Sequence, residues 1–421
     1  MTDARPVLDG PVVVIGGGIV GLSCAWFLRR AGADVVVVEA GQRVGQGASR
    51  GNAGAICPSM VEPLAAPGMF RTILDDLRRP DAALHIHPST MPLMAGFLMR
   101  FARATTTAAH ERGVQALAQL GRGVTAAYDE LAAAGIGTNA RRDGYLTLHA
   151  SEAGARAERE AIARMASMGM CEPPGSILDG DGLRRLEPLV SERIAAGFEL
   201  PGERWIDAGA FVDELDTALR AEGVVVRTDA RVRALADVGD GVEVETASGT
   251  VDGAVAVVAA GVWSSDLLRS LGTKLCLYPG KGYSFSVQPG RMPAHVLHLP
   301  DAHVMLTPFP GRLRVAGTME FDGTMDRFNP GRVEAMVRAA TPFVRDVAWA
   351  DRTDEWVGPR PITPDGLPVL GPLARHPRVV VATGHNMLGV TLGPITGKVV
   401  AGLLVGGDPG IDLRPFAAER F

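Results

Sequence analysis

The sequence predicts an α/β fold, α+β overall, in which a domain built on a parallel sheet is interrupted by an inserted domain of antiparallel sheet and helices. Residues 11–40 have the pattern of a strand, a helix and a second strand. An α/β pattern returns at 207–263 and again after residue 379, whereas 276–320 has the short apolar runs and Gly/Pro turns of antiparallel strands. Because α/β segments occur at the start, in the middle and at the end, we expect one discontinuous domain rather than two consecutive ones.

In the first of these segments, the opening strand is expected at 12–15, a continuous apolar run of the kind found in buried parallel strands. The helix is expected at 21–31, where apolar residues recur along one face, and Gly32 is placed to end it. The second strand, at 35–38, ends on Glu39. The three elements together form a strand–helix–strand unit with its acidic residue at the end of the second strand.

The remaining elements follow from the same kinds of pattern. Residues 41–68 are rich in Gly, Ala, Ser and Pro, which is typical of a long functional loop, and 70–170 is mostly helical in pattern. We expect further helices and strands in the following places: helices at 210–221, 330–345 and 391–404, and strands at 145–149, 224–227, 231–235, 242–246, 254–260 and 379–382.

The composition is that of a large globular protein. The chain has 421 residues, 47% of them hydrophobic, enough for a core that spans roughly two or three domains. The net charge is −5 with no long run of one sign, which argues against a nucleic-acid partner. The cysteines lie far apart in the sequence, so we expect no disulfide framework and no zinc site, and we expect a cytoplasmic location.

One uncharged stretch, residues 10–28, raises the question of a membrane span. Glycines interrupt this stretch at 16, 17, 18 and 21, and it divides into a strand, a turn and a helix. We therefore expect no integral membrane segment, while association with the periphery of the inner membrane stays open.

The turn after the first strand carries a dinucleotide-binding fingerprint. Gly16-x-Gly18-x-x-Gly21 follows a strand and opens a helix, and Glu39 ends the next strand at the required spacing. The glycines permit a tight turn, close approach of a pyrophosphate and close packing of the helix, whose N-terminus attracts the phosphates. The predicted cofactor contacts here are Gly16, Gly18, Ile19, Val20, Gly21, Glu39 and Ala40. The fingerprint alone does not distinguish FAD from NAD.

Four further segments carry a resemblance to a known family. They are Ser49-Arg-Gly-Asn-Ala-Gly54, Val257-Val-Ala-Ala-Gly-Val-Trp-Ser264, Gly358-Pro-Arg-Pro-Ile-Thr-Pro-Asp-Gly-Leu-Pro368 and Gly384-His-Asn-Met-Leu-Gly389. With the fingerprint, they make the chain resemble the D-amino-acid oxidase superfamily of flavoproteins. The resemblance is strongest to bacterial D-amino-acid dehydrogenases and their relatives that act on hydroxyproline. It implies FAD as cofactor, bound by a Rossmann-like domain.

The resemblance also implies further cofactor contacts and a domain plan. The contacts that it adds are Ser49, Asn52, Ala53, Gly54, Val232, Ala260, Gly261, Gly384, Gly389 and Thr391. The FAD-binding domain is expected to comprise 1–85, 171–271 and 346–421, and the substrate-binding domain 86–170 and 272–345.

Three residues are candidates for the chemistry. Arg360, held between two prolines, has the equivalent position of the family's carboxylate-binding arginine, and a salt bridge with Asp365 is the competing interpretation. Tyr283 could add a hydroxyl to the same carboxylate, or it could be a buried core tyrosine. His385 could lie near the flavin, or it could be a loop histidine satisfied by the backbone. We predict no metal site.

The implied activity is oxidation of the Cα–N bond of a D-amino acid, or of a cyclic imino acid such as D-proline or hydroxyproline, by hydride transfer to flavin N5. The product imine then gives a 2-oxo acid and ammonia. Alternatives are a glycine- or sarcosine-type amine oxidase that uses oxygen directly, a nicotinamide-dependent dehydrogenase, and a non-catalytic flavin-binding subunit. The sequence leaves the electron acceptor open between a quinone, another carrier and oxygen.

Overall fold

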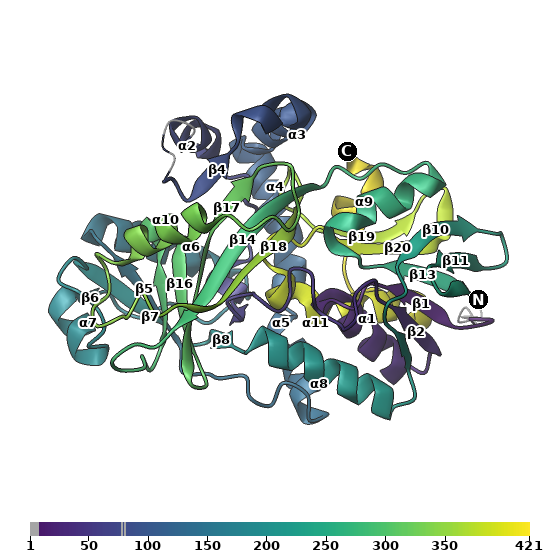
Figure 1. The fold of residues 1–421 in the computed structure, drawn as a ribbon, viewed down its shortest axis with the longest axis horizontal. Helices are drawn as coiled ribbons and strands as arrows, with labels where there is room; N and C mark the ends of the chain where they lie inside the picture. Colours follow the sequence, from purple (N-terminus) through teal and green to yellow (C-terminus); the bar gives the residue numbers. More distant parts are fainter. Residues whose placement is uncertain (1–7, 77–78, 80) are drawn as a thin grey trace.

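The computed structural model describes residues 8–76, 79 and 81–421, and two sheets dominate it (Figure 1). A six-stranded sheet lies on the right of the view and a nine-stranded sheet on the left, with helices around both. The mixed α/β architecture confirms the predicted fold class. The first seven residues of the predicted FAD-binding domain, and residues 77, 78 and 80, lie outside the described residues.

The six-stranded sheet is the parallel sheet that the sequence predicts. Its order is β19-β20-β13-β1-β2-β9, and all neighbours are parallel except β19 and β20. Both β1 and β13 are buried at every position, as a central strand covered on both faces must be. The strand bounds are β1 Val12–Ile15, β2 Val35–Val38, β9 Val225–Arg227, β13 Val255–Val258, β19 Val369–Leu373 and β20 His376–Thr383.

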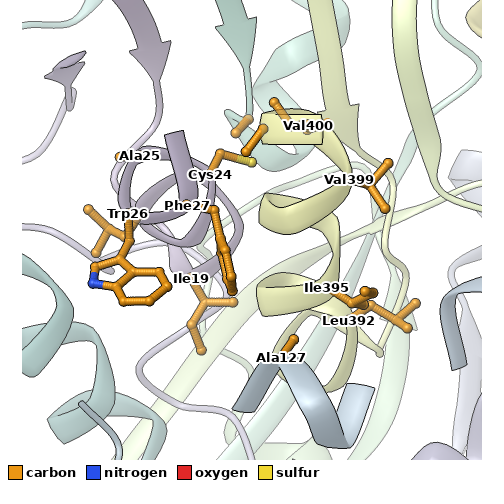
Figure 2. Packing of buried hydrophobic residues seen from close by; sticks show 14 of the residues in the cluster. Ile19, Cys24, Ala25, Trp26, Phe27, Ala127, Leu392, Ile395, Val399 and Val400 are labelled. Atoms are coloured by element: carbon orange, nitrogen blue, oxygen red, sulfur yellow. The ribbon is translucent and has the colours of Figure 1, made fainter. Parts of the chain in front are cut away.

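Two helices, α1 (Ile19–Arg30) and α11 (Gly389–Ala401), pack closely beside this sheet (Figure 2). A Cβ built on Gly397 would lie 2.5 Å from the Ser23 carbonyl oxygen, and one built on Gly393 would lie 2.8 Å from Cγ2 of Ile19. Glycine on α11 therefore sets the short distance between the two helices.

The stretch Gly389–Gly406, which is α11 with the π-helical turn after it, is the one described helix long and apolar enough to cross a membrane. It is 61% buried inside the protein and also packs against α5 (Val124–Ala133). Burial of this kind is what the core helix of a domain shows.

The nine-stranded sheet is largely antiparallel and has the order β18-β14-β17-β16-β15-β5-β7-β6, with β4 paired to β17. Its edge strand β18 contains Pro359 and Pro361, and prolines are tolerated at an edge because one side of an edge strand needs no ladder hydrogen bonds. The bounds are β4 Leu84–Ile86, β5 Tyr145–His149, β6 Leu178–Asp179, β7 Ala196–Leu200, β14 Tyr278–Val287, β15 Val296–Leu299, β16 Val304–Phe309, β17 Arg312–Phe321 and β18 Thr353–Ile362.

Two small antiparallel sheets and the other helices complete the structure. The small sheets are β10-β11-β12 (Val232–Asp237, Val242–Thr246 and Gly249–Gly253) and β3-β8 (Ala55–Ile56 and Arg204–Trp205). The helices are α2 Met69–Asp76, α3 Met91–Ala104, α4 Thr107–Gly121, α6 Glu152–Ser167, α7 Gly180–Leu186, α8 Ala208–Ala221, α9 Ser264–Leu267 and α10 Pro330–Ala340.

Sheet membership departs from the predicted domain boundaries at four strands. We placed residues 84–85, 178–179, 196–200 and 353–362 in the FAD-binding domain, but the strands that contain them, β4, β6, β7 and β18, pair within the nine-stranded sheet. Sequence pattern shows that a strand exists more readily than it shows the strand's partner, because pairing is a long-range choice. The boundaries themselves stay a prediction.

Candidate active site

A cavity of about 850 Å³ extends between the two sheets. At one end it is lined where β1, β2 and β13 finish, and at the other by residues of β14, β17 and β18. Clefts at the carboxyl ends of parallel strands are the usual ligand sites of α/β sheets. Of the predicted site residues, all line this cavity except Gly21, Gly54 and Gly384.

The fingerprint turn lies at the first end. Gly16 has φ +112°, a conformation that glycine adopts without strain, and a Cβ on Gly21 would overlap the Gly16 carbonyl oxygen. Gly16 and Gly21 thus close the turn on itself, whereas Gly18 faces the cavity. The Ser49 hydroxyl accepts a 3.1 Å hydrogen bond from the backbone N–H of Ile19 at the first turn of α1. No acidic residue occupies that turn, so its positive end suits a pyrophosphate.

Glu39, at the end of β2, has its carboxylate fixed by the backbone. Its oxygens accept hydrogen bonds from the N–H groups of Gly17 at 2.6 Å and Gly41 at 2.7 Å. Each carboxylate oxygen keeps a further lone pair, which fits the hydroxyls of a ribose.

Residues 47–58 form the flavin loop, the segment that the family resemblance places beside the flavin, and this loop is held by the nine-stranded sheet. The Asn52 side chain accepts a 2.8 Å hydrogen bond from the Gly54 N–H, and the Ala53 carbonyl accepts one from the Thr307 hydroxyl of β16 at 2.8 Å. Ser284 of β14 donates to the Gly51 carbonyl at 2.7 Å. Asn52 therefore shapes the loop, and Gly54 serves a close approach to Ile206 rather than the cavity wall.

Other predicted contacts line the cavity from β10, the end of β13 and α11. Val232, Ala260 and Gly261 lie on this wall, and Ala40 lines the cavity just after β2. Three residues that the sequence analysis did not predict as contacts join them: Arg231, Arg233 and Trp263. The arginines flank Val232 in the sequence, and that pattern was the available signal for them.

The N-terminus of α11 also faces the cavity, through Gly389 and Thr391. The Thr391 hydroxyl donates to the Ala55 carbonyl at 3.1 Å and accepts from the Cys57 N–H at 3.2 Å, which joins the helix to the flavin loop. The first turn of α11 contains no acid, so its positive end can stabilise negative charge on a bound ring. Gly384 lies behind this wall, with Thr363 against it.

His385 is buried, and its Nε2 is 2.9 Å from the Thr396 hydroxyl of α11. Burial lowers the pKa of His385 to about 4, so the ring is neutral at physiological pH. A neutral ring that links the loop before α11 to that helix is suited to support the wall of the site, and it carries no charge that could bind a substrate carboxylate.

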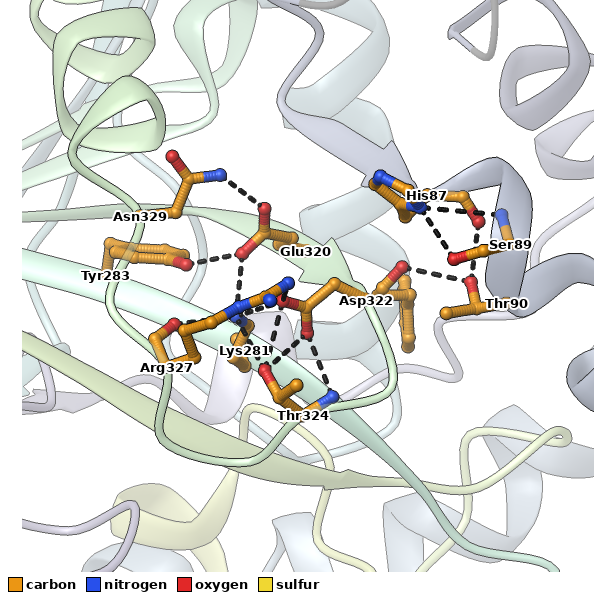
Figure 3. A network of polar contacts seen from close by, with 11 residues as sticks. His87, Ser89, Thr90, Lys281, Tyr283, Glu320, Asp322, Thr324, Arg327 and Asn329 are labelled. Atoms are coloured by element: carbon orange, nitrogen blue, oxygen red, sulfur yellow. Dashed lines mark hydrogen bonds and ion pairs between the residues drawn. The ribbon is translucent and has the colours of Figure 1, made fainter.

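Tyr283 belongs to a polar network beneath the cavity (Figure 3). Its hydroxyl donates to a carboxylate oxygen of Glu320, which also pairs with Lys281 Nζ at 2.9 Å and accepts from Asn329 at 2.7 Å. The fully buried Lys281 also pairs with Asp322 at 2.8 Å. Burial, reinforced by the Glu320 carboxylate, raises the pKa of Tyr283. The Tyr283 phenol keeps its proton and donates it in the hydrogen bond to Glu320. A hydrogen bond from Tyr283 to a substrate carboxylate would therefore require the Tyr283–Glu320 hydrogen bond to break.

Arg360 lies at the cavity wall on β18 with its guanidinium against Gly282 of β14, where a Cβ would overlap it. Its Nη1 donates to the Thr318 carbonyl at 2.7 Å. No acidic side chain pairs with Arg360 within the described part of the chain. Burial lowers its pKa to about 10, which leaves the guanidinium cationic at neutral pH.

The competing salt bridge between Arg360 and Asp365 does not form. Asp365 instead pairs with Arg420 near the C-terminus, at 2.7 Å. Arg360 is thus a cation at a cavity wall with no carboxylate beside it in the part of the chain that the structure describes, which is the arrangement that an anionic ligand would complete.

Glu203, which the sequence analysis did not single out, is buried behind the cavity-lining Cys57. One of its oxygens accepts a 3.0 Å hydrogen bond from the Ser59 N–H, and the other has no hydrogen-bond partner among the described residues. Burial raises its pKa to about 7. The described residues contain no group of three or more His, Cys, Asp or Glu side chains arranged for a metal ion.

The raised pKa of Glu203 predicts a pH-dependent stability. Because the folded protein holds this proton more tightly than the unfolded chain, stability should fall as pH rises from about 4.5 to about 7. In Glu203→Gln, the decrease in the free energy of unfolding over this pH range should be smaller than in wild type by up to about 3 kcal/mol. Denaturant unfolding at pH 4.5 and pH 8 measures it, with the exposed Glu152→Gln as control. Equal pH dependence in wild type and Glu203→Gln would contradict the prediction.

With this geometry in view, comparison with known proteins assigns the class. The family model described as DAO, FAD dependent oxidoreductase, matches residues 11–403, and the chain belongs to this family. The protein is therefore an FAD-dependent oxidoreductase, and the fingerprint turn, Glu39 and the α11 N-terminus are the parts of the cavity that fit FAD. The predicted family and cofactor are confirmed.

Individual relatives are similar over almost their whole length. The chain is 31% identical to a D-amino acid dehydrogenase of Rhizorhabdus wittichii, over 97% of this chain and 100% of the relative. Among solved structures, glycine oxidase from Geobacillus kaustophilus matches with a TM-score of 0.72 at 24% identity, covering 98% of this chain and 99% of that one. L-proline dehydrogenase from P. horikoshii matches with a TM-score of 0.76 at 17% identity, covering 98% and 97%. These structural likenesses show the shared fold.

Proposed function

We propose that this enzyme oxidises the Cα–N bond of D-amino acids, or of cyclic imino acids such as D-proline and hydroxyproline. The observation that carries the proposal is Arg360, a cationic guanidinium at the cavity wall that has no carboxylate partner among the described residues. The relatives named D-amino acid dehydrogenase, 29–31% identical over 97% of this chain, support the D configuration.

In this proposal, Arg360 clamps the substrate carboxylate through the guanidinium N–H groups that Thr318 does not use. Anchored there, the substrate has its Cα held in one orientation, and orientation is a large part of the catalytic effect in such a reaction. Bound FAD supplies the hydride acceptor at N5. The substrate loses hydride from Cα and a proton from nitrogen to give an imine, which water converts to a 2-oxo acid and ammonia. A cyclic imino acid would give a cyclic imine.

The test is an anaerobic titration of the FAD-loaded enzyme, followed in the visible absorbance of the flavin. D-amino acids, D-proline and cis-hydroxy-D-proline should bleach the oxidised bands, and the L-enantiomers should not. Bleaching by glycine or sarcosine alone, with direct oxygen consumption, would replace the proposal by an amine oxidase. No bleaching by any amino or imino acid would contradict it.

Arg360→Lys provides the matched variant, because it keeps the charge and removes the planar fork. A charge-assisted hydrogen bond contributes about 1.5–3 kcal/mol, so the substrate concentration for half-reduction should rise roughly 10- to 100-fold. FAD content should not change, since Arg360 lies at the end of the cavity away from the fingerprint. Wild-type affinity in this variant would remove Arg360 from the carboxylate site.

A further inference from the structure

Strand β17 is irregular where it passes the active site. Lys281 of β14 pairs with Glu320, but Tyr283 pairs with Gly317, so Gly282 lies opposite both Thr318 and Met319. Two residues opposite one define a β-bulge, which re-aims the backbone and the side chains around it. The bulge therefore lies directly opposite the glycine on which the Arg360 guanidinium rests.

Thr318, within this bulge, has φ +52°. The left-handed region is unusual for any residue with a side chain and is a genuine outlier for a β-branched one. Such a conformation is strained and persists only where surrounding contacts enforce it. The Thr318 side chain makes such contacts, and its backbone carbonyl is hydrogen-bonded to Arg360.

The side chain of Thr318 is anchored at the β4 side of the sheet. Its hydroxyl donates to the Ala83 carbonyl at 2.7 Å and accepts from the Arg332 guanidinium. The Met319 N–H donates to the same Ala83 carbonyl at 2.7 Å. The bulge is thus fastened to the segment that leads into β4, on the far side from Arg360.

The backbone carbonyl of Thr318 is turned toward Arg360. It accepts the 2.7 Å hydrogen bond from Nη1, and it is the one hydrogen-bond acceptor of that guanidinium within the described residues. The Thr318 carbonyl holds the Arg360 guanidinium without neutralising its charge. A protein carboxylate in the position of this carbonyl would compete with the substrate carboxylate for the guanidinium.

We infer that Thr318 is a positioning residue. Its strained backbone, locked by the hydroxyl anchor, fixes the Arg360 guanidinium so that its free edge is presented to a ligand carboxylate. This inference rests on the proposed role of Arg360. It adds that Thr318 determines the orientation of the Arg360 guanidinium.

The test measures binding of a carboxylate that cannot react. Propionate affinity of the FAD-loaded enzyme is determined by isothermal titration calorimetry, and the limiting rate of flavin reduction is measured in parallel. Thr318→Val removes the anchor at nearly constant volume and frees the backbone to relax, so propionate affinity should fall about tenfold, the loss of one charge-assisted hydrogen bond. Thr318→Ser keeps the hydroxyl and should bind within about twofold of wild type.

A coupling measurement separates positioning from general damage. In an Arg360→Lys background, Thr318→Val should cause little further loss, because the residue that it positions is already gone. Thermal unfolding and FAD content check that each variant folds, and Thr318→Ala, which removes the same hydroxyl, replaces Thr318→Val if that variant is not folded.

Two results would overturn the inference: wild-type propionate affinity in the folded variant without the hydroxyl, or equal losses from Thr318→Val in the presence and absence of Arg360. Failure of the proposed function gives a different pattern, in which the wild-type enzyme itself neither binds propionate nor is reduced by any amino or imino acid.

Discussion

Gly21→Ala is expected to yield a protein that retains no FAD and unfolds at a lower temperature than wild type. A Cβ on Gly21 would overlap the carbonyl oxygen of Gly16, which is backbone and cannot rotate away. To relieve the overlap, α1 must move off β1, and the helix N-terminus then leaves the pyrophosphate position. Overpacking of this kind costs about 3 kcal/mol or more when backbone must shift.

Gly18→Ala is the matched comparison, because it adds the same methyl group only three residues away in the sequence, at a position where no such overlap occurs. A Cβ on Gly18 would lie 3.4 Å from the Ser49 hydroxyl oxygen, which is ordinary contact, and Gly18 has φ −78°. This variant should fold with wild-type thermal stability in the absence of FAD, yet bind FAD weakly, since the methyl group lies where the pyrophosphate approaches.

Flavin absorbance after purification and thermal unfolding of the apoproteins measure both effects. Stoichiometric FAD in Gly21→Ala would show that α1 tolerates displacement. Equal loss of apoprotein stability in both variants would show that Gly18, too, is needed for packing.

The elements that the sequence predicted best are those whose signal is local. The strands at 12–15, 35–38, 145–149 and 242–246 have the predicted bounds, since each is a short run of strand-forming residues. Helix α1 begins at Ile19, two residues before the predicted start, because the fingerprint turn itself enters the helix.

The features that the sequence did not predict depend on distant partners. β18 contains two prolines and became a strand only because it lies at a sheet edge beside β14. The hydrogen bond that Tyr283 donates depends on Glu320, which is distant in the sequence. The placement of Arg360 depends on Thr318, a β-branched residue whose left-handed backbone conformation is not favoured by its residue type. Sequence therefore indicated most of the residues that line the cavity, and their roles stay predictions, while their protonation and orientation depend on tertiary contacts.

Gly282→Ala is expected to remove substrate-dependent flavin reduction while FAD stays bound. The new Cβ would overlap the guanidinium of Arg360. Because a guanidinium ends a flexible side chain, it should swing away while the β14–β18 backbone keeps its pairing. The displaced fork would lose both the Thr318 carbonyl and the substrate carboxylate. A misplacement of this size costs on the order of 10²-fold in kcat/KM.

Gly280→Ala, two residues away on the same strand, is the control that separates this effect from damage to the sheet. There a Cβ would lie 2.8 Å from Cγ1 of Ile362 and 3.2 Å from Sδ of Met319, both apolar groups, and no Arg360 atom is among its nearest neighbours. Gly280→Ala should lower thermal stability but leave propionate affinity unchanged. Gly282→Ala should lower propionate affinity but leave thermal stability unchanged. If both variants lose propionate affinity to the same degree, the effect belongs to the sheet as a whole. If neither variant loses propionate affinity, the Arg360 guanidinium does not bind the carboxylate from its position against Gly282.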